Sequence, residues 1–286
     1  IRDSYSKEII SILKENDIDV GDKIKIIRDG DTFIGRVMPR ISFGDEKSLI
    51  IKLENGYNTG IKINSKTEIS KIEKYQEPKK EKLDIKINTN KKSISILSTG
   101  GTIVSKVSYA TGGVKGTMTP EEVFLNIPEL KEIVNLKETN ILFNVSSENI
   151  TPNHWKIIAE KTAESLKTSD GVVIMHGTDT LHYTAAALSF MLKNLSKPVV
   201  LLGSQRSSDR GSADGYLNLI CGAYTAISDI SEVVVVMHGT INDDYCLINR
   251  GTKTRKMHTS RRDAFRPINN LPIGKIWKKT GFTWNG

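Results

Sequence analysis

The chain has 286 residues, of which 38% are hydrophobic, and carries a formal net charge of +8. That length allows one large domain, or a small domain together with a medium one. No apolar run approaches the roughly 18 residues of a membrane-spanning helix, and the two cysteines, Cys221 and Cys246, are too few for a disulfide framework. We therefore expect a cytoplasmic protein without a metal site of the Cys/His type. The positive charge fits an RNA partner and fits mere solubility equally well.

The N-terminal part of the chain predicts a helix followed by a small β domain. Residues 4–16 carry an apolar stripe with helical spacing, and Ser4 is placed to cap the helix. From residue 20 to about residue 72 the pattern changes to short runs typical of strands, and Asn55-Gly56 between two such runs is typical of a hairpin. So short a set of strands is expected to close into a small barrel.

An α/β domain is predicted after residues 76–92, whose content of Lys, Glu and Asn predicts an exposed linker. Apolar runs of strand length alternate with segments of helical length, which predicts a parallel sheet with right-handed crossovers. The predicted strands cover residues 94–98, 141–145, 171–176, 198–202 and 232–237. The predicted helices begin at Thr119-Pro120 and Thr151-Pro152 or cover residues 181–192 and 213–227, and a hairpin is predicted over residues 272–286.

Two strand ends of similar layout contain most of the candidate chemistry. Thr99-Gly100-Gly101-Thr102 follows the first predicted strand, and Gly177-Thr178-Asp179-Thr180 follows the third. Open α/β sheets bind ligands at the carboxyl ends of their strands. A threonine hydroxyl is a poor nucleophile at neutral pH, so it needs a neighbouring base or cation, which Asp179 and a lysine can supply. This pattern favours Thr102 as a nucleophile in amide hydrolysis; the alternatives are an ordinary glycine-rich turn and helix capping by Asp179.

Two further features allow both a structural and a functional interpretation. His176 and His238 end two strands of similar sequence and are candidates for a pair of bases or for metal ligands, but we interpret both as buried histidines with satisfied hydrogen bonds. The second of these strand ends has Ile241 where the first has Asp179, so it lacks the acid. The basic segment 255–265 is either a solvated loop that contacts nucleic acid or the source of a buried lysine that acts as a base.

Residues 95–103 and 173–180 together resemble the two signatures of the bacterial-type L-asparaginase/glutaminase family. The same family pattern continues, in order, at residues 202–206, 212–215 and 256–259. The resemblance covers residues 93–286 and implies an asparaginase-like α/β amidase domain with a parallel sheet. In front of it, residues 35–40 and 51–58 resemble the small barrel of the GatD family of archaeal glutamyl-tRNA(Gln) amidotransferases, which ordinary asparaginases lack. We therefore expect a helix and a small β-barrel over residues 1–75, a linker over 76–92 and the α/β domain over 93–286.

The resemblance also implies roles for individual residues. Thr102 is the implied nucleophile, and Tyr109, on a flap formed by residues 104–116, is implied to position or deprotonate it. Thr178, Asp179 and Lys256 are the implied second catalytic group, and which of the two threonines attacks first stays open. Lys256 is preferred to Lys253 because its distance to Asp263-Ala264-Phe265 fits the family better. The implied substrate-binding residues are Thr99, Gly101, Ser147, Glu148 and Gly177.

An activity and partners follow from the same resemblance. The chain is expected to be the amidase component that releases ammonia from glutamine or asparagine for the conversion of Glu-tRNA(Gln) to Gln-tRNA(Gln). A GatE-like partner protein is expected to hold ATP, Mg²⁺ and most of the tRNA contact, with no cofactor on this chain, in a heterotetramer that contains a homodimer of it. The alternatives are a free-standing L-asparaginase and an RNA-binding module with an inert amidase fold. Family members continue into a C-terminal α/β domain, so a chain that runs from Ile1 to Gly286 is expected to be a fragment without it.

Overall fold

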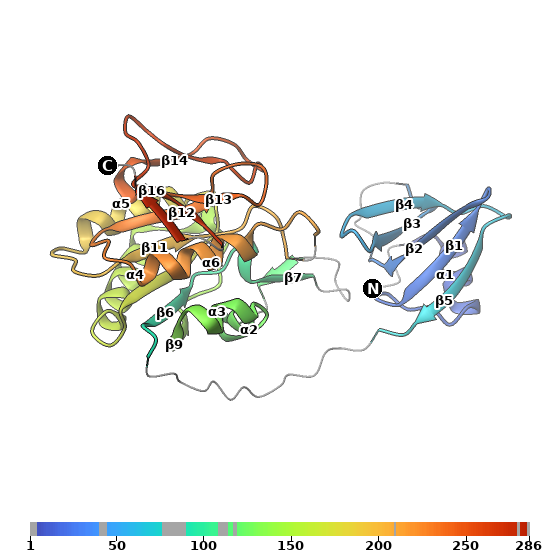
Figure 1. The fold of residues 1–286 in the computed structure, drawn as a ribbon. Helices are drawn as coiled ribbons and strands as arrows, with labels where there is room; N and C mark the ends of the chain where they lie inside the picture. The colour runs from blue at the N-terminus through green and yellow to red at the C-terminus, as the bar shows by residue number, and fades with distance from the viewer. Residues whose placement is uncertain are drawn as a thin grey trace. The chain divides into compact units, whose positions relative to one another are not determined.

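A computed structural model describes residues 5–39, 45–75, 90–107, 114–116, 119–208, 210–278 and 281–284. The chain forms two compact units, each with its own hydrophobic core (Figure 1). The first unit covers residues 1–83 and the second begins at residue 84, apart from the short segments 107–115 and 209–211, which group with the first. Within the described ranges, no helix combines the length and the apolar character that crossing a membrane requires.

The first unit is a helix packed on a five-stranded antiparallel sheet. Helix α1 (Lys7–Glu15) begins after Ser6, whose side chain accepts a hydrogen bond from Ile9 N, so the cap is Ser6 and the prediction of Ser4 is wrong. The strands are β1 (Lys23–Arg28), β2 (Asp31–Val37), β3 (Ser48–Leu53), β4 (Asn58–Lys62) and β5 (Glu68–Glu73). The core of this unit forms where apolar side chains of the helix pack on the strands. It includes Leu13 of α1, Ile24 and Ile26 of β1, and Leu49 and Ile51 of β3.

The strands of this unit lie in the order β4-β3-β2-β1-β5, so the predicted small β domain is present. In the described residues β4 and β5 are the two ends of the hydrogen-bonded order, and no ladder between them closes a ring. Both end strands expose most of their residues, and β5 includes Glu68, Lys71 and Glu73. Exposed charged side chains are how edge strands avoid further pairing.

The second unit is an α/β domain around an eight-stranded sheet in the order β17-β16-β13-β12-β11-β10-β6-β9. Its parallel strands are β6 (Ser93–Ser98), β9 (Asn135–Ile141), β10 (Gly171–Met175), β11 (Val199–Leu202) and β12 (Val233–His238). Three antiparallel strands extend the sheet, β13 (Tyr245–Arg250), β16 (Gly274–Trp277) and β17 (Gly281–Trp284). The predicted α/β class and the predicted C-terminal hairpin are confirmed.

In the described residues, helices α2 to α6 pack around this sheet (Figure 1). They are α2 (Pro120–Leu125), α3 (Pro128–Ile133), α4 (Pro152–Ser165), α5 (Leu181–Met191) and α6 (Gly215–Ala226). Helix α6 packs against the central strands and α3, whereas α5 packs against β11, β12 and α4. Thr119 starts α2 with the predicted capping box, in which its hydroxyl accepts from Glu122 N and the Glu122 carboxylate accepts from Thr119 N.

The chain also contains two small two-stranded sheets, and one strand of the second unit differs in position from the predicted one. Strand β7 (Ser105–Val107) pairs with β8 (Val114–Gly116) inside the predicted flap, and β14 (Thr254–Lys256) pairs with β15 (Phe265–Pro267). The strand predicted over residues 141–145 is wrong, because the strand is β9 (Asn135–Ile141) and residues 142–146 form a loop after it. β9 is an edge strand with mostly half-buried polar residues, so it lacks the apolar run by which a central strand is recognised.

Candidate active site

The two threonine-containing turns lie against each other at the carboxyl end of the sheet. β6 and β10 are neighbouring parallel strands with Ser98 opposite Met175, and Thr99 donates to Met175 O from its N at 3.0 Å and from its Oγ1 at 3.2 Å. Gly101 has a φ of 91°, and a Cβ added there would lie 2.6 Å from the Gly177 backbone. Only glycine fits both the positive φ and this close approach. The contact brings the residues that follow these two glycines, Thr102 and Thr178, to the same end of the sheet.

Lys256 joins this site from a distant part of the chain. Its Nζ donates to Thr178 Oγ1 at 2.8 Å and to Asp179 Oδ1 at 2.7 Å. Its side chain is 7% exposed, and its strand β14 is held by pairing with the fully buried Phe265. The rival, Lys253, donates instead to Asn269 Oδ1 at 3.1 Å. An ammonium group held between a hydroxyl and a carboxylate can polarise that hydroxyl and offset negative charge that develops beside it.

Ser147 connects the loop after β9 with the second turn. It begins the 3₁₀ turn η3 (Ser147–Asn149), its buried Oγ accepts from Asp179 N at 3.2 Å, and its carbonyl accepts from Thr180 Oγ1 at 2.7 Å. A Cβ on Gly177 would lie 2.7 Å from the Ser147 Cβ, so this turn also requires a glycine. Asp179 does not cap α5, because its carboxylate contacts Lys256 and the residue at the N-cap position is Thr180.

The structure therefore brings most of the predicted site residues together. Glu148 follows Ser147 and is exposed at the rim of this group. Thr102 is half-buried and opens the 3₁₀ turn η2 (Thr102–Val104). Tyr109 lies outside the described residues. No group of three or more His, Cys, Asp or Glu side chains that could hold a metal ion occurs in the part of the chain that the structure describes.

His176 and His238 are both fully buried, and both ring nitrogens of each have partners. His176 Nδ1 donates to Gly177 O at 2.7 Å, and Nε2 accepts from Thr184 Oγ1 at 2.9 Å. His238 Nδ1 lies 2.6 Å from Asn218 Oδ1, and Nε2 lies 3.1 Å from Asp243 Oδ1. The interpretation of both as buried, satisfied histidines is confirmed. Burial lowers the pKa of both, that of His176 to about 4.

We expect His176 to make the second unit lose stability as the pH falls. Its pKa of about 4 in the folded chain lies below the ordinary value of 6.5, so the unfolded chain binds the extra proton first. The stabilising contribution is therefore complete above the unfolded pKa, falls as the pH decreases toward 4, and amounts to about 2 kcal/mol between about pH 7.5 and pH 5. All three tryptophans lie in this unit, so urea unfolding followed by their fluorescence measures it. The His176→Gln variant should lack this part of the pH dependence, and an unchanged dependence would contradict the assignment.

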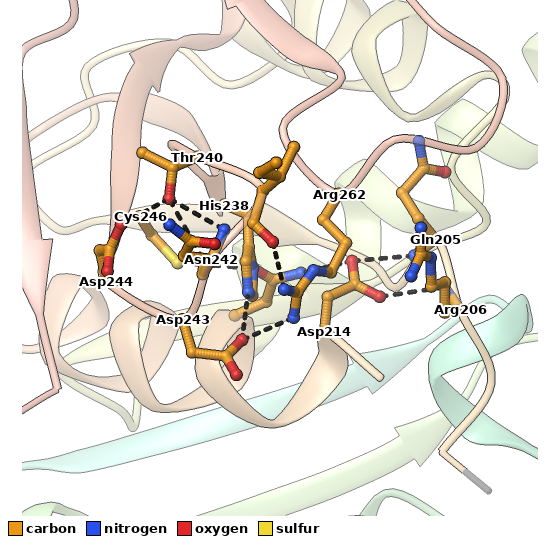
Figure 2. A network of polar contacts seen from close by, with 12 residues as sticks. Gln205, Arg206, Asp214, His238, Thr240, Asn242, Asp243, Asp244, Cys246 and Arg262 are labelled. Carbon is orange, nitrogen blue, oxygen red and sulfur yellow. Dashed lines mark hydrogen bonds and ion pairs between the residues drawn. The ribbon is translucent and has the colours of Figure 1, made fainter. Parts of the chain in front are cut away.

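A buried polar network that the sequence analysis missed supports the loop after Lys256 (Figure 2). The fully buried Asp214 carboxylate accepts from Gln205 N at 3.0 Å and from Arg206 N at 2.9 Å. Asn218 Nδ2 donates to the same carboxylate at 3.2 Å, and its Oδ1 contacts His238. The side chain of Gln205 in turn donates from Nε2 to the carbonyl oxygen of Arg261 at 2.9 Å. The loop between β14 and β15 is thereby tied to the loop after β11.

Asp243 places a carboxylate beside His238 in the loop after the second of these strand ends. Its Oδ1 contacts His238 and accepts from Arg262 Nη1 at 2.6 Å (Figure 2). Ile241 occupies the position of Asp179, and Asp243 follows His238 by five residues rather than three, so its carboxylate contacts the histidine and Arg262 rather than a lysine. The run Asn242-Asp243-Asp244 directly after an apolar strand is the signal that was available.

Much of the positive charge in the segment 255–265 is paired with carboxylates. Arg261 Nε donates to Asp263 Oδ1 at 2.9 Å, Arg266 also pairs with Asp263, and Arg262 pairs with Asp243. Hydrogen bonds from Arg261 and the charges of both arginines lower the pKa of the Asp263 carboxyl. These ion pairs hold the loop after Lys256 in place.

Comparison with known proteins agrees with this arrangement. A family model described as "Asparaginase, N-terminal" matches residues 93–285, and one described as "GatD N-terminal domain" matches residues 18–72. The GatD component of the glutamyl-tRNA(Gln) amidotransferase of Pyrococcus furiosus is 52% identical over 272 residues, covering 93% of this chain and 62% of the relative. The corresponding protein of Thermococcus kodakarensis is 50% identical over 278 residues, covering 95% and 63%.

This chain spans less than two thirds of the length of these relatives. Among solved structures, the thermostable L-asparaginase from Thermococcus kodakarensis matches with a TM-score of 0.60 and 29% identity, covering 68% of this chain and 56% of that one. The site geometry lies within the residues matched by the longer of the two family models. The chain therefore belongs to the asparaginase family, and a GatD N-terminal domain precedes its asparaginase domain.

Proposed function

We propose that this chain provides the glutamine- or asparagine-hydrolysing site of a tRNA-dependent amidotransferase. The observation that carries the proposal is the contact of Lys256 with Thr178 and Asp179, beside the turn that contains Thr102. This arrangement offers two hydroxyls, a cation and a carboxylate at one end of a sheet, which is what amide hydrolysis through a threonine requires. The GatD N-terminal domain and the names of the relatives favour an amidotransferase over a free-standing L-asparaginase.

In the proposed reaction Thr102 is the nucleophile. Its Oγ attacks the side-chain carboxamide carbon of the donor, the C–N bond breaks, and the hydroxyl proton leaves with the ammonia. Water then hydrolyses the acyl-threonine ester, which releases the free acid and restores the hydroxyl. Lys256, held by the Asp179 carboxylate, polarises Thr178 and offsets the negative charge that develops as the tetrahedral species form. Tyr109 is proposed to position or deprotonate Thr102.

The remaining predicted residues are proposed to bind the donor. We place the donor's α-carboxylate at Ser147 and its α-amino group at Glu148 and Asp179, whose carboxylates are exposed beside the site. Thr99, Gly101 and Gly177 form the floor of the site, where close backbone packing keeps side chains away from the donor. Main-chain amides near Gly101 and Thr102 are proposed to stabilise the oxyanion, an interaction whose loss costs about 3–4 kcal/mol.

The proposal includes a partner for the second half of the reaction. A GatE-like partner protein would receive the ammonia, bind ATP and Mg²⁺ and activate the glutamate on Glu-tRNA(Gln), while this chain holds no cofactor. We propose a homodimer of this chain within a heterotetramer. The relatives that support this are themselves described as one of the subunits of a glutamyl-tRNA(Gln) amidotransferase.

A glutaminase assay of the complete protein tests the proposal. Ammonia release from glutamine and from asparagine is measured alone, with the partner protein, and with partner and Glu-tRNA(Gln). We expect release to rise when partner and tRNA are present and to be matched by Gln-tRNA(Gln) formation. Steady ammonia release from asparagine at a rate that neither the partner protein nor Glu-tRNA(Gln) changes would instead identify a free-standing asparaginase. Tight tRNA binding without hydrolysis in any mixture would identify a binding module.

A further inference from the structure

We propose that a cavity beside the first turn of α5 binds the phosphate group of a small nucleotide. The cavity has a volume of about 280 Å³ and lies between α5 and the segment formed by the 3₁₀ turn η4 (Gly251–Lys253) and β14. Its polar lining includes His182, Lys253, Arg255 and Asn269. Lys256 does not line it, because its side chain turns toward Thr178 and Asp179. The cavity is therefore separate from the hydrolytic site, although Arg255 and Lys256 are adjacent in the chain.

The lining of the cavity is positively charged and contains no acidic side chain. Lys253 contacts a neutral amide, that of Asn269, and among the described residues no carboxylate pairs with Arg255. The three arginines that follow in the chain differ in this respect, since each is paired with Asp243 or Asp263. The protein thus neutralises the basic side chains next to the cavity and leaves those that line it available to an anion.

His182 contributes its imidazole ring to the cavity wall. Its side chain is nine-tenths buried, and its Nδ1 is buried without a hydrogen-bond partner in the described residues. Burial, followed by the charges of Arg255 and Lys256, lowers the pKa of the ring.

The chemistry of the lining favours phosphate, and the size favours a small ligand. A guanidinium group binds phosphate oxygens through two parallel hydrogen bonds, and a lysine adds a point charge. The volume lies at the lower end of ligand pockets, which start at roughly 300 Å³. Tyr183 is half exposed at the rim, with its ring 4.1 Å from that of His182, and offers an aromatic face for a base. Inorganic phosphate and AMP therefore serve as probes for the two sources of this group.

Calorimetric titration of the full chain with inorganic phosphate and with AMP tests the site. We expect both probes to bind, and Arg255→Gln to weaken both by about tenfold, as the loss of a charge-assisted hydrogen bond does. The matched control is Lys193→Gln, which removes one exposed positive charge from the same unit outside the cavity and should leave both affinities within about twofold. His182→Phe keeps an aromatic ring without nitrogen atoms and should also weaken both probes.

The outcomes separate a built site from general attraction to a basic protein. Equal weakening by Arg255→Gln and Lys193→Gln, or no binding of either probe, overturns the proposal. If AMP binds more tightly than phosphate and Tyr183→Leu removes the difference, the source of the phosphate is a nucleotide. Equal affinities assign the site to free phosphate and overturn the nucleotide. Unfolding curves of each variant are compared with those of the parent chain, so that lost binding is not confused with lost folding. Hydrolysis of glutamine plays no part in these readouts, so the two proposals fail independently.

Discussion

Replacing Thr102 by alanine is expected to abolish glutamine-dependent formation of Gln-tRNA(Gln) in the complete enzyme while leaving ammonia-dependent formation intact. The substitution removes the proposed nucleophile, and removing a covalent nucleophile lowers turnover by at least about 10⁴-fold. Free ammonia does not need this step, because in the proposed reaction the glutamate is activated on the partner protein. The measurement is Gln-tRNA(Gln) formed with either amide source at equal enzyme concentration.

The matched control for this variant is Thr102→Ser, which keeps a hydroxyl at the same position and should retain glutamine-dependent activity. Loss of both activities in Thr102→Ala would point to damaged assembly rather than to a missing nucleophile. Mass spectrometry of the enzyme quenched during turnover settles the order of attack. An acyl adduct on Thr102 is expected, and it should accumulate in Thr178→Ala if the second group serves the hydrolysis of the ester. An adduct on Thr178 would reverse the roles assigned to the two threonines.

Replacing Lys256 by methionine is expected to lower kcat for amide hydrolysis by about 10²- to 10⁴-fold, the range for loss of a group that assists proton transfer. Methionine keeps the length and the apolar stem of the side chain but has no ammonium group. Thr178 Oγ1 and Asp179 Oδ1 then both lose the donor that lies 2.8 and 2.7 Å away. Because the ammonium group contacts these groups rather than the exposed rim, the change is expected mainly in kcat. Steady-state kinetics with glutamine separates kcat from KM.

Lys193→Met is the control for this second variant, because Lys193 is an exposed lysine outside the site and its loss should change neither constant. Lys253→Met tests whether Lys253, the alternative to Lys256 in the sequence analysis, takes part in hydrolysis. Its Nζ contacts Asn269 and neither threonine, so a loss as large as that in Lys256→Met would contradict the assignment of Lys256.

Local signals in the sequence were sufficient to predict most of the elements that position the site. The capping box at Thr119, the continuous apolar runs of the central strands and the glycine-rich turns after β6 and β10 depend on neighbouring residues alone. Local patterns did not locate the partly buried strand β9. This strand lies at the sheet edge and has no apolar run, so the predicted strand begins several residues too late. Ser6 caps α1 in place of Ser4 because two nearby serines offer the same local chemistry.

The sequence by itself determined that threonine, glycine and aspartate side chains follow two buried strands, and it indicated a lysine for the site. Only the tertiary structure decided that those turns touch through Gly101 and Gly177, and that Lys256 reaches Thr178 across 78 residues of chain. Likewise, the pairing of His238 with Asp243 depends on how a loop folds back after its strand. The physical reason is that strand order and loop packing set which distant side chains meet, and these follow from burial of the whole core rather than from any local pattern.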